Sequence, residues 1–314
     1  GGGPQAEDGT EDKRYLTDMV GADGRRNGIM AETASETNRE ALLEAKDLKK
    51  TFSGRRTDAF AAVDGVSFRL FPGEILGIAG ESGCGKTTLA RMLARLLEPD
   101  SGEIFLEGKK ISGPGGRSVR EICRTIQMVF QNPAASFDPR RTLGYSVSEG
   151  LRNSGMAKKA AAEKAQALLE QCGLPGSLAG RYPHEVSIGQ CQRAAIARAI
   201  AVGPKILICD EATASLDVTV QRQIISLLSE LREQTGMSYL FISHDLALMQ
   251  MFCSRLLVMH DGTIIEEGTP DDVIGSPREE YTRNLIHSVH KHRKGRCLNS
   301  AYCQLFKVFC SKSS

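Results

Sequence analysis

The sequence predicts an α/β fold in which helices cover both faces of a parallel sheet. Short apolar runs, which indicate buried strands, alternate along the chain with helical stretches, a pattern typical of βαβ units. A glycine-rich loop joins the first of these runs to the first helix. Apolar residues make up 41% of the 314 residues and charged residues 25%, so the chain can bury a core and is not fibrous or wholly disordered.

The individual elements follow from this pattern. Buried strands are expected at 75–79, 126–130, 206–209 and 239–243. Helices are expected at 86–97, 158–172, 190–202 and 220–234. Alternating apolar residues predict further strands at 43–52, 61–70 and 102–111. Residues 255–268 predict a hairpin that turns at Asp261-Gly262, and the stretch 133–185, without a buried-strand run, predicts a mostly helical insertion.

Charge divides the chain into three parts. Residues 1–40 hold nine acidic and five basic side chains with little hydrophobic periodicity, which predicts a disordered arm. Residues 287–314 hold six basic side chains and no acidic one. The whole chain has 40 basic and 38 acidic residues, and this balance does not predict a nucleic-acid partner. No run approaches the about 18 apolar residues of a membrane helix, so any membrane role is expected to depend on partner chains.

The glycine-rich loop carries a phosphate-binding motif. Gly80-Glu-Ser-Gly-Cys-Gly-Lys86-Thr87 fits G-x-x-x-x-G-K-[ST] and lies between a strand and a helix, the context that this motif requires. Its backbone N–H groups can converge on phosphate oxygens at the helix N-terminus. Lys86 is expected to reach the β- and γ-phosphates, and Thr87 to ligate Mg²⁺. The expected nucleotide contacts are Gly80, Glu81, Ser82, Gly83, Cys84, Gly85, Lys86, Thr87 and Thr88.

Two acidic residues, Asp210 and Glu211, follow the apolar run at 206–209. They are expected at the carboxyl edge of the sheet, where open α/β folds bind ligands. Asp210 suits the coordination shell of Mg²⁺, and Glu211 is placed to orient or deprotonate an attacking water. The alternative is a strand that ends in two solvated acids, but the phosphate loop upstream provides a site for them to join.

Further segments resemble the ATPases of ABC transporters. Val186-Ser-Ile-Gly-Gln190 resembles the LSGGQ signature, Ser215-Leu-Asp217 the D-loop, Gln131 the Q-loop and His244 the switch histidine. These motifs occur in the family's order, and the resemblance covers about residues 42–268. It implies an ABC ATPase domain with a P-loop NTPase fold, a parallel core sheet and an N-terminal antiparallel β subdomain. The implied boundaries are 41–268 for that domain, about 132–185 for its helical insertion and 269–314 for a C-terminal extension.

A narrower resemblance points to one class of importer. The stretch Met128 to Arg140, His184-Glu185, Ser243 to Leu246 and the segment from Gly268 to Thr282 are similar to ATPases of the peptide and nickel importers. This implies an ATP-hydrolysing subunit, peripheral on the cytoplasmic face of the membrane, that energises uptake of peptides, nickel or a related small solute. The implied partners are a second ATPase subunit, identical or different, two membrane-spanning permease subunits and an extracytoplasmic solute-binding protein.

The same resemblance implies how the residues share their roles. His244 would hold the γ-phosphate and orient Glu211, and Asp217 would belong to the D-loop. The implied Mg²⁺ contacts are Thr87, Gln131 and Asp210. An aromatic side chain before the first core strand should stack on adenine, for which Phe52 is the first candidate and Phe60 the alternative.

The signature would serve the ATP of a facing subunit. Ser187, Gly189 and Gln190 are the implied contacts with that ATP, because a helix N-terminus forms a second anion site. Ile188 stands where the family usually has glycine, and a β-branched residue is stiff and restricted to negative φ. Two outcomes are open: Ile188 weakens the partner's ATP site, which would slow one site of a heterodimer, or it points away without effect.

The tail holds three cysteines, at Cys297, Cys303 and Cys310. Their spacing resembles that of cysteines in some peptide-importer ATPases, where four thiolates hold an iron–sulfur cluster. A fourth cysteine is missing here, and nearby histidines at His287, His290 and His292 would complete a zinc site instead. A flexible basic tail with unligated thiols is the third interpretation.

Two other functions are weighed against the importer subunit. A soluble ABC protein of translation or DNA repair typically carries two cassettes or a long coiled coil, neither of which is present here. A regulatory module that binds ATP without turnover would not need Glu211 and His244. Only Ile188 favours this interpretation.

Overall fold

The computed structural model describes residues 40–53, 59–114, 118–213 and 216–293. From Ala41 onward these residues belong to one unit of the chain. The expected arm at its N-terminal side and the three tail cysteines, Cys297, Cys303 and Cys310, lie outside the described residues.

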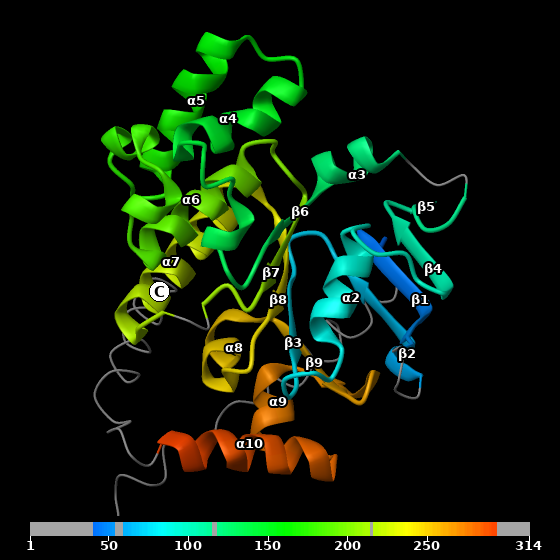
Figure 1. The fold of residues 1–314 in the computed structure, drawn as a ribbon. Helices are drawn as coiled ribbons and strands as arrows, with labels where there is room; N and C mark the ends of the chain where they lie inside the picture. The colour runs from blue at the N-terminus through cyan, green and yellow to red at the C-terminus, as the bar shows by residue number, and fades with distance from the viewer. Residues whose placement is uncertain (1–39, 54–58, 115–117, 214–215, 294–314) are drawn as a thin grey trace, which may run out of the picture. The chain divides into compact units, whose positions relative to one another are not determined.

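A six-stranded sheet with the order β10-β9-β3-β8-β7-β6 forms the centre of the described part (Figure 1). Neighbouring strands from β9 to β6 run parallel, and β10 is antiparallel to β9 at one edge. The strands are β3 (Ile75–Ala79), β6 (Ile126–Val129), β7 (Ile206–Asp210), β8 (Ser238–Ile242), β9 (Arg255–His260) and β10 (Thr263–Gly268). The predicted α/β fold with a parallel core sheet is confirmed, and the hairpin turns at Asp261-Gly262 as expected.

A second, antiparallel sheet has the order β2-β1-β4-β5. Its strands are β1 (Leu43–Phe52), β2 (Phe60–Leu70), β4 (Ser101–Leu106) and β5 (Lys109–Lys110). The single strand expected at 102–111 is wrong, because the chain reverses within it. Glu107 and Gly108 have φ values of 52° and 69°, which is the geometry of a two-residue hairpin turn.

A helix begins within or just after each of four motif segments. These helices are α2 (Lys86–Leu93), α6 (Ile188–Ile200), α7 (Val218–Thr235) and α8 (Leu246–Phe252). The prediction that α2 extends to residue 97 is wrong by about one turn. Arg95 adopts φ 57°, and the N–H of Leu96 donates to the carbonyl of Arg91, which is a helix-ending arrangement with a left-handed residue.

The insertion between β6 and α6 contains α4 (Leu143–Asn153), α5 (Lys158–Gln171) and the short 3₁₀ turns η1 (Ala134–Ser136), η2 (Gly176–Gly180) and η3 (Pro183–Glu185). Four helices were not predicted from the sequence: α3 (Val119–Thr125), α8, α9 (Pro270–Gly275) and α10 (Glu280–Arg293). α9 and α10 follow the last strand of the central sheet (Figure 1).

The central sheet separates two hydrophobic cores, because side chains alternate between its faces. On β8, Tyr239 and Phe241 pack into the core that includes α4 to α8, whereas Leu240 and Ile242 pack into the core that includes α2 and the antiparallel sheet. Both faces of β3, β7 and β8 are therefore buried. Along these three strands, the residues at and just beyond the carboxyl ends are the ones available to form a site.

Candidate functional site

The phosphate loop between β3 and α2 takes a backbone conformation that only glycine tolerates. Gly80, Gly83 and Gly85 have φ values of 152°, 89° and 105°. A Cβ on Gly80 would lie 2.3 Å from the carbonyl oxygen of Met259, and one on Gly85 would lie 1.9 Å from that of Ala62. The loop is therefore wrapped against two neighbouring strands, and Gly85 leads directly into the N-terminus of α2.

Lys86 lies under this loop with only 4% of its surface exposed. Its ammonium donates to the carbonyl oxygens of Gly80 at 2.8 Å and Glu81 at 2.6 Å. The positive charge is thus held against the backbone of the loop, next to the N-terminus of α2.

Thr87 and Asp210 meet although 123 residues separate them, and the Thr87 hydroxyl donates to Asp210 Oδ1 at 3.1 Å. Burial is the main cause that raises the pKa of Asp210, with the hydrogen bond from Thr87 acting in the opposite direction. A hydroxyl and a carboxylate are hard oxygen donors of the kind that Mg²⁺ prefers. The residues present therefore fit a magnesium ion.

Glu211 follows the last residue of β7 in a left-handed conformation, with φ 48°. Its N–H donates to the carbonyl oxygen of Ile242 at 3.0 Å, which fixes the bend. Its carboxylate accepts a hydrogen bond of 2.6 Å from Gln131 Nε2, and its other oxygen lies 3.9 Å from Nδ1 of His244. The structure thus brings three predicted residues together, and the amide of Gln131, predicted for Mg²⁺, here binds the Glu211 side chain.

A cavity of about 440 Å³ lies over the loop and reaches the antiparallel sheet. Of the predicted nucleotide contacts, six line it: Ser82, Gly83, Gly85, Lys86, Thr87 and Thr88. Gly80, Glu81 and Cys84 do not. Phe52 and Phe60 both line the cavity, and they are direct cross-strand partners on β1 and β2. The structure therefore places both aromatic candidates at the same site.

The signature segment forms the first turn of α6. The Ser187 hydroxyl accepts from the N–H of Gln190 at 3.2 Å, and the Gln190 side chain accepts from the N–H of Ser187 at 3.0 Å, which is a capping box. Ile188 occupies the first helical position and is 58% exposed, so its side chain points outward and its backbone is unstrained. A Cβ on Gly189 would lie 2.8 Å from Val220, so this glycine lets α6 approach α7.

Asp217 caps the next helix. Its carboxylate accepts from the N–H groups of Thr219 at 2.9 Å and Val220 at 3.0 Å, which explains why α7 begins at Val218. Ser215, the first residue of the expected D-loop, lies outside the described residues.

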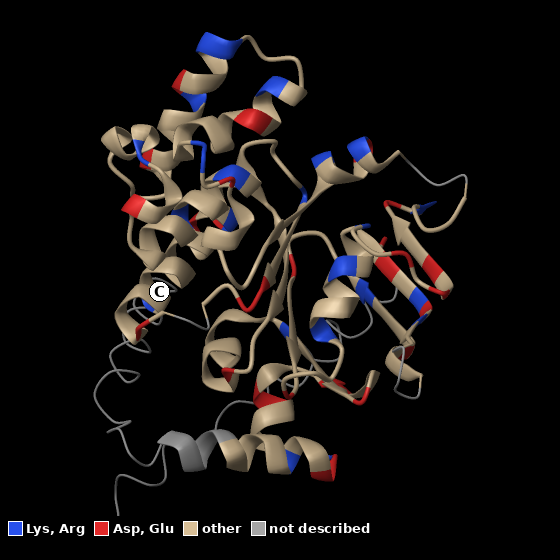
Figure 2. Cartoon of the chain, in the orientation of Figure 1, with Lys and Arg blue, Asp and Glu red and all other residues tan. Residues whose placement is uncertain are grey.

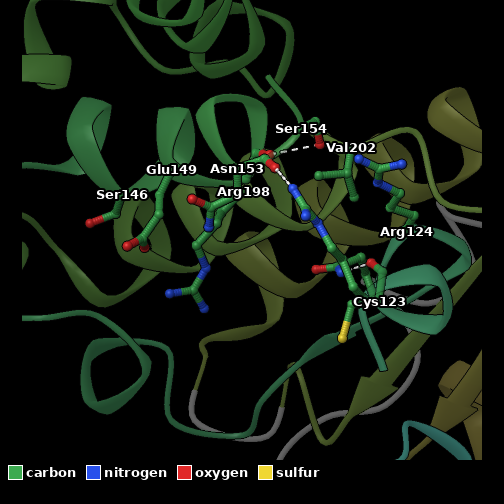
Figure 3. A pocket seen from close by; sticks show the side chains of 11 residues that line it. Cys123, Arg124, Ser146, Glu149, Asn153, Ser154, Arg198 and Val202 are labelled. Atoms are coloured by element: carbon green, nitrogen blue, oxygen red, sulfur yellow. Dashed lines mark hydrogen bonds between the residues drawn. The ribbon is translucent and has the colours of Figure 1, made fainter. Parts of the chain in front are cut away.

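A second cavity, of about 310 Å³, lies between α3, α4 and α6 and was not predicted from the sequence (Figure 3). Arg120 and Arg124 line it from α3, on which Figure 2 shows basic residues in blue, and Glu149 lines it from α4. Arg198 lines it from α6 and donates to the carbonyl oxygen of Ser136 at 2.6 Å and to its hydroxyl at 2.8 Å. The wall of this cavity is thereby tied to the segment that follows Gln131.

The described residues contain no group of three histidine, cysteine or acidic side chains that would hold a metal ion. In the same part of the chain, no helix has the length and apolar character needed to cross a membrane.

The comparisons with known proteins agree with these motifs. A family model described as ABC transporter matches residues 63–214. The oligopeptide transport ATP-binding protein OppF of Escherichia coli K12 is 42% identical over 261 residues, which are 80% of this chain and 78% of OppF. The chain belongs to the ABC transporter family. AppF of Bacillus subtilis 168, another oligopeptide transport ATP-binding protein, is 44% identical over 265 residues, covering 82% of this chain and 80% of AppF.

The ABC transporter family also includes longer relatives. The glutathione import ATP-binding protein GsiA of Salmonella paratyphi A is 45% identical over 273 residues, which are 83% of this chain but 44% of GsiA. The chain spans less than half the length of that relative.

Solved ABC structures have the same fold. The ATP-binding cassette MJ0796, solved as a post-hydrolysis dimer bound to ADP and phosphate, matches with a TM-score of 0.66 and 27% identity, covering 73% of this chain and 99% of the cassette. CbiO1 of Clostridium perfringens, part of the ABC transporter complex cbiONQ, matches with a TM-score of 0.66 and 26% identity, covering 85% and 99%. Membership of this family implies ATP and Mg²⁺ as ligands.

Proposed function

We propose that this chain is the ATP-binding and ATP-hydrolysing subunit of an importer for short peptides. The observation that carries the proposal is the gathering of the phosphate loop, the Thr87–Asp210 pair and the Glu211 carboxylate at one edge of the central sheet. The solute class is supported by the relatives, which are named for oligopeptide transport and glutathione import. Peptide-like solutes are therefore favoured over nickel.

The proposed reaction divides among the residues of this edge. Phe52 or Phe60 stacks on the adenine ring, and the loop N–H groups and Lys86 hold the β- and γ-phosphates. Mg²⁺, when bound between Thr87 and Asp210, neutralises charge on those phosphates. Glu211 orients the attacking water and accepts its proton at a carboxylate oxygen.

In this proposal, Gln131 and His244 position the Glu211 carboxylate, which both of them approach. With the Gln131 amide at 2.6 Å, one carboxylate oxygen of Glu211 already accepts a hydrogen bond at the place where the attacking water would donate. The amide must therefore leave before the water can take its place. Since Gln131 precedes the insertion, this movement would couple hydrolysis to a displacement of α4 and α5.

We further propose that two ATPase subunits, identical or different, enclose the nucleotide between them. The outward-facing Ile188 and the capped start of α6 support this, because a helix N-terminus exposed at the surface can bind the phosphate of a facing subunit. MJ0796 was solved as a dimer. In this arrangement Ser187, Gly189 and Gln190 contact the partner's ATP, and Asp217 lies at the start of a helix next to them.

The cavity between α3, α4 and α6 is proposed as the contact with the membrane-spanning subunits. Three arginines line it against one acid, Glu149, and this excess of positive charge suits an acidic cytoplasmic segment. The Arg198–Ser136 contact joins this cavity to the segment after Gln131, so movement at the nucleotide can reach it. The proposal places the chain at the cytoplasmic face of the membrane, as an ATPase domain at 41–268 with a C-terminal extension.

An assembled transporter provides the test of this function. We expect the chain, co-purified with permease subunits and a solute-binding protein and placed in proteoliposomes, to hydrolyse ATP several-fold faster when the binding protein carries a peptide. Removal of Mg²⁺ with EDTA should stop hydrolysis, because the charge on the phosphates is then left unneutralised. A rate that responds to nickel and not to peptides would contradict the solute class, and failure to co-purify would contradict the importer itself.

Ile188→Gly tests the signature in the same assembly. We expect it to raise the ATPase rate about threefold, because Ile188 is exposed beside the helix N-terminus where the partner's phosphate would bind, and bulky apolar side chains there exclude favourable anion contacts. Val119→Gly is the matched control, since Val119 is also a first-turn, exposed β-branched residue behind a capping box, on α3. An unchanged rate in Ile188→Gly would show that the side chain is harmless.

A further inference from the structure

We propose that Tyr281, in the segment after the central sheet, is a positioning residue for the phosphate loop. Its hydroxyl holds the first peptide of that loop and thereby sets the affinity for nucleotide. This inference rests on the proposed ATP-binding function, and it assigns to the C-terminal extension a direct part in that function.

The contact joins residues that are 200 positions apart. The backbone N–H of Glu81 donates to the Tyr281 hydroxyl oxygen at 3.0 Å. The Tyr281 ring stacks on His260 at the end of β9, with ring centroids 3.8 Å apart and an angle of 25° between the planes. The hydroxyl is therefore aimed at the loop by a second contact that the ring makes independently.

The segment that carries Tyr281 is itself anchored to the sheet. The buried Glu266 of β10 accepts from the N–H of Arg278 at 2.9 Å and from that of Glu279 at 3.3 Å, just before α10 begins. Burial acts to raise the pKa of Glu266, but hydrogen bonds, those from these N–H groups among them, and the charge of Arg278 outweigh it and the pKa is lowered, so the carboxylate stays charged. Leu285 of α10 is buried in the core that includes α4 to α8. The chain is consequently anchored on both sides of Tyr281, by Arg278 and Glu279 before it and by Leu285 after it.

The Tyr281 hydroxyl and the Lys86 ammonium form hydrogen bonds with opposite sides of one peptide group in the loop. Glu81 N–H and the Gly80 carbonyl belong to the same planar unit, and in a trans peptide they point in opposite directions. Tyr281 accepts from the N–H, while the Lys86 ammonium donates to the carbonyl oxygen at 2.8 Å. Rotation of this peptide would break both bonds, so the hydroxyl of Tyr281 fixes the starting direction of the loop and the place of the Lys86 charge.

Glycine on one side of this peptide makes the restraint necessary. Gly80 has φ 152° and lacks a side chain that would restrict rotation. Without the hydroxyl, the loop would spend more time in arrangements whose N–H groups do not converge. The apparent dissociation constant for nucleotide rises in proportion as the binding-competent fraction falls. Burial is the main cause that raises the pKa of Tyr281, so the phenol stays neutral near pH 7 and accepts through its oxygen.

Tyr281→Phe removes only this hydroxyl and keeps the stack on His260. We expect the dissociation constant of the full chain for Mg²⁺ with a non-hydrolysable ATP analogue, measured by calorimetry, to rise about fivefold, the loss of one ordinary hydrogen bond. The melting temperature should stay within about 2 °C of the wild type. In the assembled transporter, KM for ATP should rise by the same factor while kcat changes less than about twofold.

Tyr239→Phe is the matched control. The Tyr239 hydroxyl also bonds to the backbone, but as the donor, to the carbonyl oxygen of Leu228 at 2.9 Å, and it lies in the core away from the loop. Its loss should lower the melting temperature and leave the nucleotide affinity unchanged. A second variant, Tyr281→Leu, removes the ring stack as well and should weaken binding further than Tyr281→Phe.

The outcomes separate this inference from the function on which it rests. A wild-type chain that binds no nucleotide would overturn the proposed function and this contact with it. A wild-type chain that binds normally, with Tyr281→Phe binding equally well, would overturn only the role of Tyr281. Equal losses of stability in both Tyr→Phe variants, without a change in affinity, would likewise reduce Tyr281 to a structural residue.

Discussion

Glu211→Gln is expected to lower the ATPase rate of the assembled protein by about 100-fold or more while the variant still binds Mg·ATP. The change keeps the size of the side chain and its place beside Gln131 and His244, but an amide cannot take a proton from water. Nucleotide contacts in the loop are untouched, so binding should remain within about twofold of the wild type. Phosphate release in single-turnover experiments and nucleotide binding by fluorescence measure the two quantities.

The same variant tests whether nucleotide joins two subunits. Because ATP persists in the Glu211→Gln protein, its dimer with the cognate ATPase should elute as a stable species from a sizing column in Mg·ATP and separate when ADP replaces ATP. Glu230→Gln is the control, since Glu230 lies on the exposed side of α7 and accepts from Ser226. Turnover within tenfold of the wild type would remove Glu211 from the proposed mechanism, and a monomer in Mg·ATP would contradict enclosure between subunits.

Gly85→Ala is expected to abolish nucleotide binding, with an affinity loss of about 100-fold or more. The added Cβ would lie 1.9 Å from the carbonyl oxygen of Ala62, a backbone atom that cannot move without displacing β2, and φ is 105°. The loop must therefore open at the point where it enters α2. Equilibrium binding of Mg·ATP and the melting temperature of the same sample distinguish loss of the site from loss of the fold.

Gly236→Ala separates this clash from backbone strain alone. Gly236 ends α7 with φ 69°, and an added Cβ would meet nothing within 4 Å. The control should lose some stability, because alanine disfavours positive φ, and should bind nucleotide like the wild type. If Gly85→Ala behaves in the same way as this control, the loop is more adaptable than its packing against Ala62 indicates.

The sequence predicted the buried strands of the central sheet almost residue by residue. The run 75–79 coincides with β3, and 206–209 is one residue shorter than β7, because continuous apolar runs with polar neighbours leave little freedom in placing a buried strand. The reversal at Glu107-Gly108 was missed, since glutamate is an uncommon residue at positive φ and gives no turn signal. The short helices α3, α8 and α9 were missed because six or seven residues hold too few turns to show a period.

The candidate site followed from motifs whose backbone context is local. Lys86, Thr87, Asp210, Glu211 and His244 come together as the motifs indicated, because each lies at or beyond the carboxyl end of a strand of the same sheet. Contacts between segments far apart in sequence could not be predicted in this way. The hydrogen bond between Glu81 and Tyr281 and the cavity with Arg198 depend on how separate elements pack, and no pattern within either segment encodes them.

The left-handed backbone at Glu211 limits which amino acids this position can accept. The steric cost of φ near 48° is largest for β-branched residues, so valine, isoleucine or threonine would distort the main chain before any chemistry is considered. Asparagine and aspartate tolerate such a backbone but are one methylene shorter than glutamate. Few substitutions at this position should therefore give a folded protein. Among those that do, asparagine and aspartate keep the main-chain conformation and change only the length of the side chain.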